Sequence, residues 1–499
     1  MGSWIGICEH RFAAEMEGKM SDRQKVRTIY TNDGECDDMN TFLHQMLYLN
    51  DLELEGIVYS CSCFHYKGIP EKGIEAKRWA EPEWMYRHID SYEEIYPNLK
   101  RQDPDYPSPE YLRSITAIGN VKYVSEMEEV TPGSELIRKA LLKEDPRRLY
   151  VQIGGGTSTV ARALKSIEEE YRGTKKWEEI YRTVSDKLVI VMIVTQDETY
   201  KDYISVSWPE VEMIHCMQIM PVAFLYGEKA DPKDALECFS GAWMKEHLLE
   251  KSRFMEQYHT WLDGHEYPGE EWESQFGCNP ELAAGNWWGK AKHQKYDMIS
   301  EGDSPSFLYL LDRGLRSLEN PSFGGWGGRY ELRKENEFHN ARRYFLSCED
   351  EPKDGVDGGA LAMSRWICDW MNDFAARASW TVKKEYGEVN HLPELRIEGG
   401  CDKAAMPGET VEIKAFAKDP GDTMTLTWWR YREADTCKQE ISLLQEQNED
   451  GTGGSVRFTV PENALKGDTI HLVLTCRDSA HNEFPEYMTA YARVIVTVV

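Results

Sequence analysis

Thr31-Asn32-Asp33-Gly34-Glu35-Cys36-Asp37-Asp38 is the stretch that decides the fold, because it joins two different hydrophobic patterns. Residues 26–30 before it are β-branched and aromatic, which is typical of a short strand. Residues 54–60 have the composition of a second strand. A strand, a helix and a strand with short joints predict parallel strands, and ligands bind such sheets beyond the carboxyl ends of the strands. The helix is indicated by apolar residues at helical spacing, at Met39, Phe42, Leu43, Met46 and Leu47.

The acidic loop carries four carboxylates in six residues, at Asp33, Glu35, Asp37 and Asp38. These charges repel one another unless a cation lies among them, and carboxylate oxygens suit Ca²⁺ or Mg²⁺ better than Zn²⁺. The alternative is an acidic helix start, in which the carboxylates only stabilise the helix dipole. One or two acids are enough for that purpose, so four of them favour a metal site.

Two later strands are expected to end at the same edge of the sheet. Residues 149–153 run into Gly154-Gly155-Gly156-Thr157, where the glycines allow the backbone to approach a ligand closely, although a tight turn would also explain them. Residues 188–194 form a continuous apolar run, which is typical of a parallel strand buried on both faces. This strand would bring Gln196 and Asp197 to the same edge, either into the site or into a solvated turn.

The segment 301–308 predicts a helix start, with Ser304 as the cap and Pro305 at the first helical position. Asp303 then lies beside a helix N-terminus, where it could complete a metal site. A glycine-rich loop follows at 324–330, but its spacing matches neither a phosphate-binding loop nor a dinucleotide-binding turn.

The remaining helical segments of the first domain are less regular. Helices are expected over 71–86, after a cap at Ser134, and over 361–380, where the last helix closes the domain. Residues 221–298 have a broken helical pattern and predict a helical insertion over the sheet edge. Its tryptophans could stack on sugar rings, but core packing is the commoner use of this residue type: Trp243, Trp261, Trp272, Trp287 and Trp288.

After residues 391–393 the pattern changes to short strands of period two. We therefore expect an α/β domain over 22–390 and an all-β domain over 394–499. Residues up to about 387 are also expected to fold alone. Short alternating strands joined by Gly-rich turns predict an immunoglobulin-like sandwich, with strands at 411–415, 424–428, 456–460, 470–474 and 494–498.

The composition is that of an ordinary globular protein, with 41% hydrophobic and 29% charged residues in a chain of 499. The net charge of −28 argues against a nucleic-acid partner, because a phosphate backbone is bound by clustered Lys and Arg. No run reaches the roughly 18 apolar residues of a membrane span, so no membrane partner is expected. The start of the chain lacks the features of a signal peptide, and the 12 cysteines have no framework spacing. We expect a cytoplasmic protein with reduced thiols that could form a homo-oligomer.

The D-x-x-x-D-D pattern of Asp33, Asp37 and Asp38 after a first strand resembles the signature of nucleoside hydrolases. The continuation through 56–60 to Phe64-His65, together with a Gly-Asp-x-Pro-Ser-Phe motif and the glycine-rich loop, is similar to a less well-understood branch. That branch is the nucleoside-hydrolase-like family described as cellulose-binding, which carries a C-terminal all-β domain. The resemblance implies an α/β fold with an open, mainly parallel sheet flanked by helices, followed by an immunoglobulin-like sandwich.

On this resemblance, Ca²⁺ is held by Asp33, Asp38, Asp303 and the backbone carbonyl of Thr157. Asp33 is also expected to deprotonate a bound water and Asp37 to hold a sugar hydroxyl, so these two are the candidate catalytic residues. Such an ion chelates a sugar diol, and nearby carboxylates stabilise an oxocarbenium-like transition state. Other side chains are candidates for substrate binding: Glu35, His65, Asn120, Gln196, Asp197, Trp326 and Arg329.

Three departures from the nucleoside-hydrolase pattern limit the transfer. The Pro-Gly after the first Asp is Gly34-Glu35 here, the His before the last metal-binding Asp is Gly302, and the Asn-rich ribose-binding segment has no clear match. The metal-binding half is kept and the nucleobase-binding half is not, which favours a glycoside or other sugar conjugate as the substrate. The expected function is a Ca²⁺-dependent hydrolase that acts on a glycosyl bond.

Other functions stay open at this point. The chain could be a carbohydrate-binding protein without catalysis, as the cellulose-related description of the family suggests. It could also be a true N-ribosyl (nucleoside) hydrolase. A scaffold with a vestigial acidic site is disfavoured, because all four expected metal-ligand positions are present.

Overall fold

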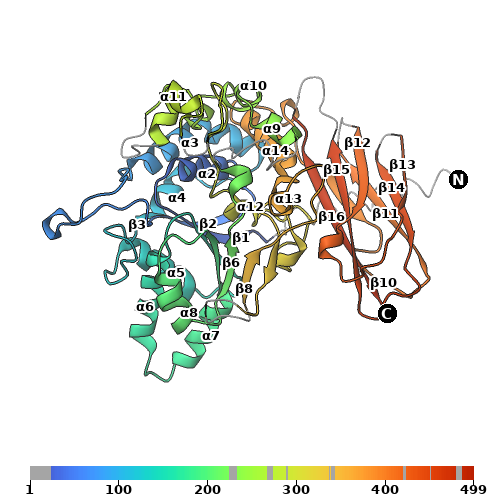
Figure 1. Ribbon diagram of the computed structural model, residues 1–499, viewed down its shortest axis with the longest axis horizontal. Helices are drawn as coiled ribbons and strands as arrows, with labels where there is room; N and C mark the ends of the chain where they lie inside the picture. The colour runs from blue at the N-terminus through green and yellow to red at the C-terminus, as the bar shows by residue number, and fades with distance from the viewer. Residues whose placement is uncertain are drawn as a thin grey trace.

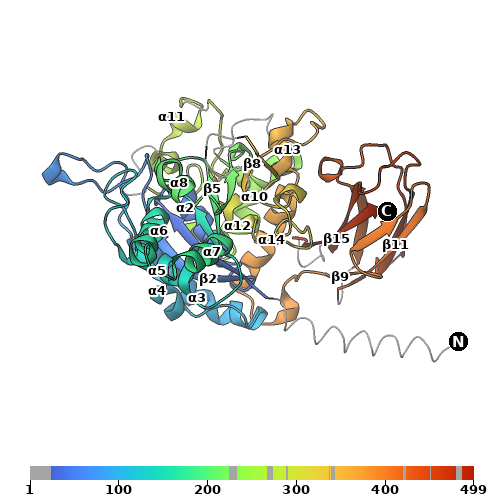
Figure 2. The ribbon, with the colours of Figure 1, turned by 90° about the horizontal axis from the view of Figure 1, so that it is seen from below.

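The computed structural model shows an α/β unit and an all-β unit side by side (Figure 1, Figure 2). The predicted start of the first domain at residue 22 lies outside the described residues, as do Trp272 and Trp288. The structure describes residues 24–223, 233–266, 273–287, 290–335, 338, 343–419, 423–449, 451–478 and 486–499.

The α/β unit is built on one eight-stranded sheet with the order β3-β2-β1-β4-β5-β6-β8-β7. Neighbouring strands are parallel except the edge pair β7 and β8. The chain runs from β1 outward to β3 and returns to β4 on the other side of β1, so the strand order reverses between β1 and β4. Ligands bind open sheets at such a point. The strands are β1 (Val26–Asn32), β2 (Leu52–Tyr59), β3 (Thr116–Ile118), β4 (Leu149–Ile153), β5 (Leu188–Ile193), β6 (Glu212–Cys216), β7 (Tyr330–Leu332) and β8 (Tyr344–Ser347).

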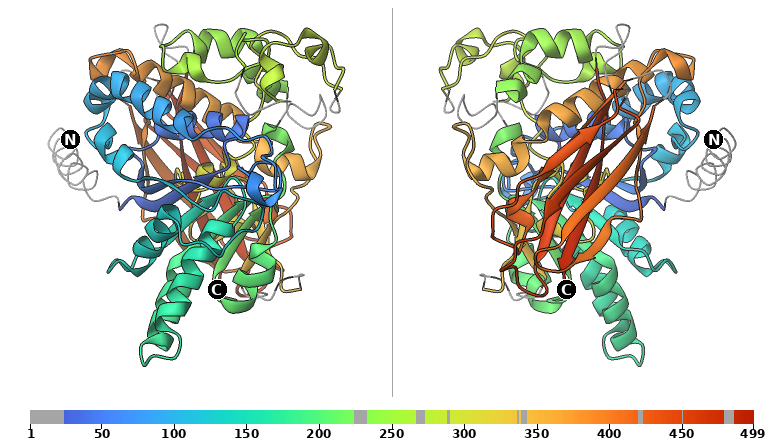
Figure 3. Two further views of the ribbon diagram at one scale, coloured as in Figure 1. Left: turned by 90° about the vertical axis from the view of Figure 1, so that its left-hand side faces the viewer. Right: turned by 90° about the vertical axis from the view of Figure 1, so that its right-hand side faces the viewer.

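Helices cover both faces of this sheet, as the end views show (Figure 3). Side chains of β5 pack alternately into the two cores: Val191 belongs to the core under α2, α3 and α14, and Ile190 to the core under α5, α6 and α7. This confirms the prediction that the apolar run is a strand buried on both faces. The helices are α2 (Cys36–Met46), α3 (Glu83–Gln102), α5 (Pro132–Leu142), α6 (Ser158–Tyr171), α7 (Trp177–Lys187) and α14 (Ile367–Trp380).

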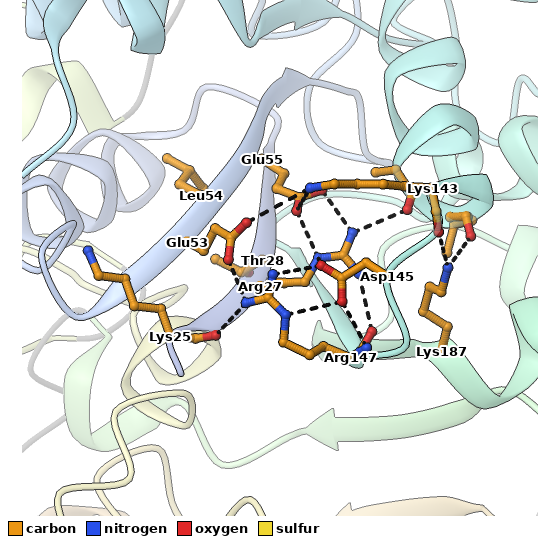
Figure 4. Close-up of polar contacts among 12 residues, drawn as sticks. Lys25, Arg27, Thr28, Glu53, Leu54, Glu55, Lys143, Asp145, Arg147 and Lys187 are labelled. Atoms are coloured by element: carbon orange, nitrogen blue, oxygen red, sulfur yellow. Dashed lines mark hydrogen bonds and ion pairs between the residues drawn. The ribbon is translucent and has the colours of Figure 1, made fainter. Parts of the chain in front are cut away.

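The amino-terminal edge of the sheet is held together by ion pairs (Figure 4). Arg27, buried at the start of β1, lies 2.8 Å from Glu55 of β2. Arg147, just before β4, lies 2.6 Å from both Glu53 and Asp145. These pairs join β1, β2 and the entry to β4, so they fix the central strands whose other ends carry the acidic loop.

The first helix on the α2 side begins later and runs longer than expected. The segment 71–86 forms a 3₁₀ turn (Pro70–Lys72) and then a loop, because Gly73 takes a left-handed φ of 72° and ends the turn. The helix α3 begins at Glu83 and continues through Pro97. Proline is a helix breaker in most interiors, so a helix that continues through Pro97 is not expected from the sequence.

Two other predicted helices differ in detail. Thr131, rather than Ser134, caps α5: the Ser134 N–H donates to the Thr131 hydroxyl at 3.1 Å, and the Thr131 N–H donates back to the Ser134 hydroxyl at 2.9 Å. The helix predicted over 361–380 is two helices, α13 (Gly358–Ser364) and α14, which meet at 365–366. The break turns Trp366 toward the C-terminal unit, where its ring meets Tyr491 edge-on.

The insertion after β6 consists of short helical pieces, as its broken pattern indicated. Trp261 stacks on His293 with 4.1 Å between ring centroids and packs with Trp287, so these tryptophans form a small core. Among the described residues no helix is long and apolar enough to cross a membrane, and the cysteines are free thiols. The remaining α-helices are α4 (Pro109–Ser114), α8 (Ser205–Ser207), α9 (Lys233–Cys238), α10 (Gly241–Met244), α11 (Pro280–Ala283) and α12 (Pro305–Leu308).

The C-terminal unit is a sandwich of two four-stranded sheets, β10-β16-β15-β12 and β13-β14-β11-β9. Buried and exposed residues alternate along β11, and the buried side chains of both sheets share one core. The five predicted strands are present, and the fold class is confirmed. The strands are β9 (Glu394–Ile397), β10 (Asp402–Ala405), β11 (Thr410–Lys418), β12 (Met424–Arg430), β13 (Leu444–Gln447), β14 (Gly453–Thr459), β15 (Thr469–Asp478) and β16 (Thr489–Val498).

The two units share a buried polar interface centred on Arg493 of β16. The guanidinium of Arg493 is fully buried and donates to the backbone carbonyls of Leu315 at 2.5 Å, Phe323 at 2.6 Å and Gly324 at 3.1 Å. Buried side chains of both units also belong to one hydrophobic core. A fragment ending at 387 would lose these donors and contacts, so the expectation that it folds alone is revised.

Candidate functional site

The candidate site lies where the strand order reverses, at the carboxyl ends of β1 and β4. Thr31 of β1 pairs with Ile153 of β4, and the Gly154 N–H donates to the Thr31 carbonyl at 3.0 Å. The acidic loop that follows β1 and the glycine loop that follows β4 therefore begin side by side. This is the arrangement predicted from the sequence.

Three buried carboxylates meet at this point: Asp37, Asp38 and Asp303. Each offers one oxygen, and the three oxygens all lie within 4.8 Å of one another. Asp37 and Asp38 stand in the first turn of α2, and Asp303 lies two residues before α12. Their exposed fractions are 8%, 0% and 3%. The structure thus brings together residues 265 positions apart. Asp38 and Asp303 are two of the four predicted ligands, and Asp37 joins them in this group.

One face of α2 holds the 300–304 loop in place, which positions Asp303. The Asn40 side-chain amide donates to the Ser300 carbonyl at 3.0 Å. One turn along, His44 Nδ1 lies 2.8 Å from Glu301 Oε2, and Glu301 also accepts a 2.6 Å bond from the Tyr258 hydroxyl. His44 and Glu301 were not predicted from the sequence. The available signal was the pair Asn40 and His44, polar residues at i and i+4 on one face of the helix.

The acids carry the electrostatic signature of a cation site. Burial raises the pKa of Asp38 well above its usual value, and the negative charges of Asp303 and Asp33 raise it further. Burial likewise raises the pKa of Asp303, and Asp37 adds to the effect. Negative charge gathered out of water in this way is stabilised by a positive ion among the oxygens. The donor set therefore fits a hard divalent cation.

A second group stands beside the first and consists of Asp33, Glu35 and His65, whose ligand atoms also lie within 4.8 Å of one another. His65 Nδ1 is 3.3 Å from Asp33 Oδ2 and 3.5 Å from Glu35 Oε2. Burial alone would raise the pKa of Asp33, but the charge and hydrogen bond of His65 outweigh burial and hold that pKa below its usual value. Asp33 is therefore ionised at neutral pH.

The backbone of the acidic loop links the two groups. The N–H groups of Asp33 and Glu35 both donate to Asp38 Oδ2, at 3.3 and 3.1 Å. The bond from Glu35 is part of a capping box at the start of α2. The alternative interpretation of the acids as a helix cap thus holds for Glu35 and Asp38, which form the capping box, but it does not explain Asp33, Asp37 and Asp303.

The glycine loop after β4 gives the acids room. A Cβ atom on Gly154 would lie 2.4 Å from Asp38 Oδ1, and one on Gly155 would lie 2.9 Å from Asp33 Cβ. On Gly156 it would lie 2.3 Å from Asp197 Oδ2. Side chains at these positions would displace the carboxylates. The three glycines therefore serve close approach, not merely a tight turn.

Thr157 and Asp197 face the start of α6. The Thr157 carbonyl accepts the Ala161 N–H at 2.9 Å, and its hydroxyl donates to Asp197 Oδ1 at 3.0 Å. Asp197 also accepts the Ser158 N–H at 3.0 Å, so it caps α6. Gln196 donates to the Gly154 carbonyl at 2.6 Å and supports the glycine loop. Ligation by the Thr157 carbonyl stays a prediction.

Three predicted substrate-binding residues occupy structural positions instead. The Asn120 amide is buried and donates to Glu126 Oε2 at 2.7 Å, which orders the loop before α5. Trp326 is fully buried and donates to the Tyr491 hydroxyl at 3.3 Å across the interface between the units. Arg329 pairs with Asp350 at 2.7 Å. Glycine-rich sequence around Trp326 and Arg329 suggested a binding loop, whereas the glycines serve tight packing: a Cβ on Gly327 would lie 2.5 Å from a backbone carbonyl.

The parallel sheet, its reversal point and the acidic centre define the class as a nucleoside-hydrolase-like α/β protein with an appended all-β unit. The family model described as cellulose-binding Sde182, nucleoside hydrolase-like domain, matches residues 27–330. The model described as cellulose-binding protein Sde0182, C-terminal domain, matches residues 410–498. The chain belongs to this Sde182 family. No match was found among curated proteins.

Solved structures support the fold. The chain is similar to a nucleoside hydrolase-related hypothetical protein from Saccharophagus degradans that is associated with carbohydrate metabolism, with a TM-score of 0.68 and 23% identity. The match covers 95% of this chain and 100% of that one. The effector protein XOO4466 matches with a TM-score of 0.33 and 9% identity over 72% of this chain and 95% of that one, which is too distant to support an argument.

Proposed function

We propose that the acidic centre binds Ca²⁺ and that the protein hydrolyses a glycosyl bond of a sugar conjugate. The observation that carries this proposal is the pair of adjacent groups at the reversal point of the sheet. Asp37, Asp38 and Asp303 form an all-oxygen group, and the ionised Asp33 stands beside them. Cation ligands and an ionised proton acceptor next to them are what metal-assisted hydrolysis requires.

The oxygen donors of Asp38 and Asp303 suit Ca²⁺, and in this proposal Asp37 joins them. Asp33 and the Thr157 carbonyl remain predicted additional ligands. The raised pKa values of Asp38 and Asp303 support a cation between these two carboxylates, because the ion would replace the protons that burial favours there. Bound Ca²⁺ would supply positive charge that orients sugar hydroxyls and polarises water.

The chain's own residues have distinct functions in this proposal. Asp33 is held ionised by His65, so it can accept a proton from an attacking water. Asp37 is the most exposed of the three clustered aspartates, at 8%, and the Ser300 hydroxyl lies 3.4 Å from its Oδ2. In that position Asp37 can hold a sugar hydroxyl and stabilise positive charge that develops on the sugar ring.

Gly302 favours a sugar conjugate over a nucleoside. A Cβ atom at this position would lie 2.4 Å from Asp37 Oδ2. A histidine there would have to displace the carboxylate, so this site has no place for the histidine that nucleoside hydrolases are expected to use on the base. The protein from Saccharophagus degradans is described as associated with carbohydrate metabolism, which agrees with a carbohydrate ligand.

Carbohydrate binding without hydrolysis is the second candidate function. The description of the family as cellulose-binding favours it. Both candidates need the cation group, but only the hydrolase needs Asp33 as a proton acceptor. Substitution of Asp33 therefore distinguishes the hydrolase from the binding protein.

The test is a screen of glycosides, cello-oligosaccharides and nucleosides with the full chain, in Ca²⁺ and in chelator. Turnover should require Ca²⁺, and Asp33→Asn should reduce it by at least about 100-fold, because general-base catalysis contributes 10² to 10⁴. Asp186→Asn, an exposed charge-matched change, should leave turnover unchanged. Calorimetric binding of an oligosaccharide without turnover of any substrate would establish the binding protein instead.

Further expectations accompany this proposal. The cytoplasmic location and the absence of a nucleic-acid partner stay predictions from the sequence. The homo-oligomer is also a prediction, and light scattering of the purified chain measures it directly.

A further inference from the structure

We infer that the cleft at the junction of the two units is a second ligand site, which binds a neutral oligosaccharide. The cleft has a volume of about 980 Å³ and lies between α13 and α14 of the α/β unit and β12, β15 and β16 of the sandwich (Figure 1). Ligand clefts of about 300–1,000 Å³ are common at the boundaries between domains. Among the described residues that line it, none belongs to the acidic centre, so the inference goes beyond the proposed hydrolysis and does not depend on it.

Trp429 of β12 supplies a flat apolar surface in this cleft. Its neighbour Trp428 belongs to the core of the sandwich, so Trp429 stands on the opposite face of the sheet, toward the α/β unit. The Trp429 side chain is half-buried, and its Nε1 donates to the hydroxyl of Thr475 on β15 at 3.0 Å. Trp366 packs behind it, with 5.9 Å between the ring centroids. A fixed, partly exposed indole is a surface on which the C–H face of a sugar ring can stack.

Arginine side chains stand around this ring and are held in place by carboxylates. Arg365 lies 2.7 Å from Asp350, and its guanidinium carbon is 5.7 Å from the centroid of the Trp429 ring. Arg477 lies 2.6 Å from Asp369, which is buried, while 46% of the Arg477 side chain is exposed. A guanidinium has several N–H donors in a rigid plane, and one carboxylate does not use them all. The arginines therefore offer positioned donors to the hydroxyl oxygens of a ligand on the ring.

The charges of the cleft favour a neutral ligand. Acidic and basic side chains line it in nearly equal number, and the buried carboxylates of Asp350 and Asp369 neutralise the two arginines beside the ring. An anionic ligand would compete with these carboxylates and would be repelled by the net charge of −28. A hydroxyl group can accept from a guanidinium and donate to a carboxylate without separating the pair. A sugar chain combines such hydroxyl groups with apolar ring faces, so it matches both features of the cleft.

Calorimetry of the full chain with cellohexaose, xylohexaose and mannohexaose as neutral probes tests the inference. The titrations are made in chelator, so that a sugar held through Ca²⁺ at the acidic centre does not contribute. The unmutated protein should bind at least one of the three probes. Trp429→Ala should weaken that binding at least about 10-fold, because it removes the stacking surface. Trp243→Ala, at another half-buried tryptophan, in α10 and outside the cleft lining, should leave the affinity unchanged.

Two further measurements keep the inference falsifiable. Arg477→Gln, at an exposed position, should also weaken the binding, even if Trp429→Ala does not fold. Hexagalacturonate, a charged chain of the same length, should bind at least about 10-fold more weakly than the best neutral probe. The inference is overturned if no neutral probe binds, if the folded variants bind as well as the unmutated protein, or if hexagalacturonate binds more tightly. Hydrolysis at the acidic centre is measured separately in Ca²⁺, so its failure is distinguishable from the failure of this inference.

Discussion

Asp303→Asn is the sharpest perturbation of the acidic centre, because it keeps the shape of the side chain and removes one of three clustered charges. Asp303 is 3% exposed and contributes one of the three oxygens that lie within 4.8 Å of one another. The variant should lose most of the stabilisation by Ca²⁺. Its fold should survive without the ion, since the substitution also removes charge repulsion from Asp37.

The magnitude follows from linkage. Oxygen-ligand sites of this kind bind Ca²⁺ with a Kd of about 10 µM, so 1 mM Ca²⁺ stabilises the folded protein by about 2.7 kcal/mol. At about 2.1 cal/mol/K of unfolding entropy per residue, that corresponds to a rise in Tm of about 3 °C for a chain of 499 residues. Loss of one charged ligand should weaken binding about 100-fold, which leaves a stabilisation of about 0.4 kcal/mol and a rise of less than about 1 °C.

The pH dependence has a definite sign. Without the ion, the raised pKa values of Asp38 and Asp303 mean that the folded protein binds more protons than the unfolded chain above the normal carboxyl pKa of about 4. The stability of the ion-free protein therefore falls as the pH rises through this range. The rise in Tm on adding Ca²⁺ should become larger as the pH rises. Both pH dependences should be weaker in Asp303→Asn.

Thermal unfolding between pH 4 and 8, with 1 mM Ca²⁺ or with chelator, measures these effects. Asp186→Asn is the charge-matched control, because this exposed residue lies outside the cluster and its variant should respond to Ca²⁺ as the unmutated protein does. Equal Ca²⁺ responses in Asp303→Asn and the unmutated protein, or no response in either, would refute the reasoning.

Gly154→Ala places a methyl group 2.4 Å from Asp38 Oδ1 and should lower the Ca²⁺ affinity, measured by calorimetry, at least about 10-fold. The control Gly387→Ala, whose Cβ meets nothing within 4 Å, should leave the affinity unchanged. Equal affinities of the two variants would contradict the close-approach argument. Arg493→Met leaves three buried carbonyls without their donor and should lower the free energy of unfolding by about 3–5 kcal/mol in denaturant titrations. A loss below about 1 kcal/mol would show that this interface contributes little to stability. A chain ending at 387 should be insoluble or unfolded by circular dichroism, and a folded fragment that binds Ca²⁺ would restore the expectation of an independent first domain.

Much of the fold was predictable because its signals are local. The apolar run of β5 and the alternation of β11 each follow from packing on one or two faces of a sheet, so the residues themselves carry the information. The helix α3 runs past its predicted end at residue 86 and through Pro97, because tertiary packing overrides the local penalty of a proline. The buried face of α3, against α2 and α14, supplies that packing.

The site was predictable only in part. Acids at strand ends are visible in the sequence, and the structure does bring Asp38 and Asp303 together. The pairing of His44 with Glu301 was not predicted, because it joins residues 257 positions apart and the spacing of Asn40 and His44 does not show which loop they contact. Trp326 and Arg329 were misplaced for a related reason: the surface that buries them belongs to the C-terminal unit, which a motif cannot reveal.

The long separation between Asp38 and Asp303 has a consequence for synthesis on the ribosome. At about 5–20 residues per second, Asp303 is added roughly 13–53 seconds after Asp38. The first six strands of the sheet are therefore made before the last carboxylate of the cluster exists. The proposed Ca²⁺ group is complete only after this point, so the proposed ion would stabilise a sheet that hydrophobic packing has already formed.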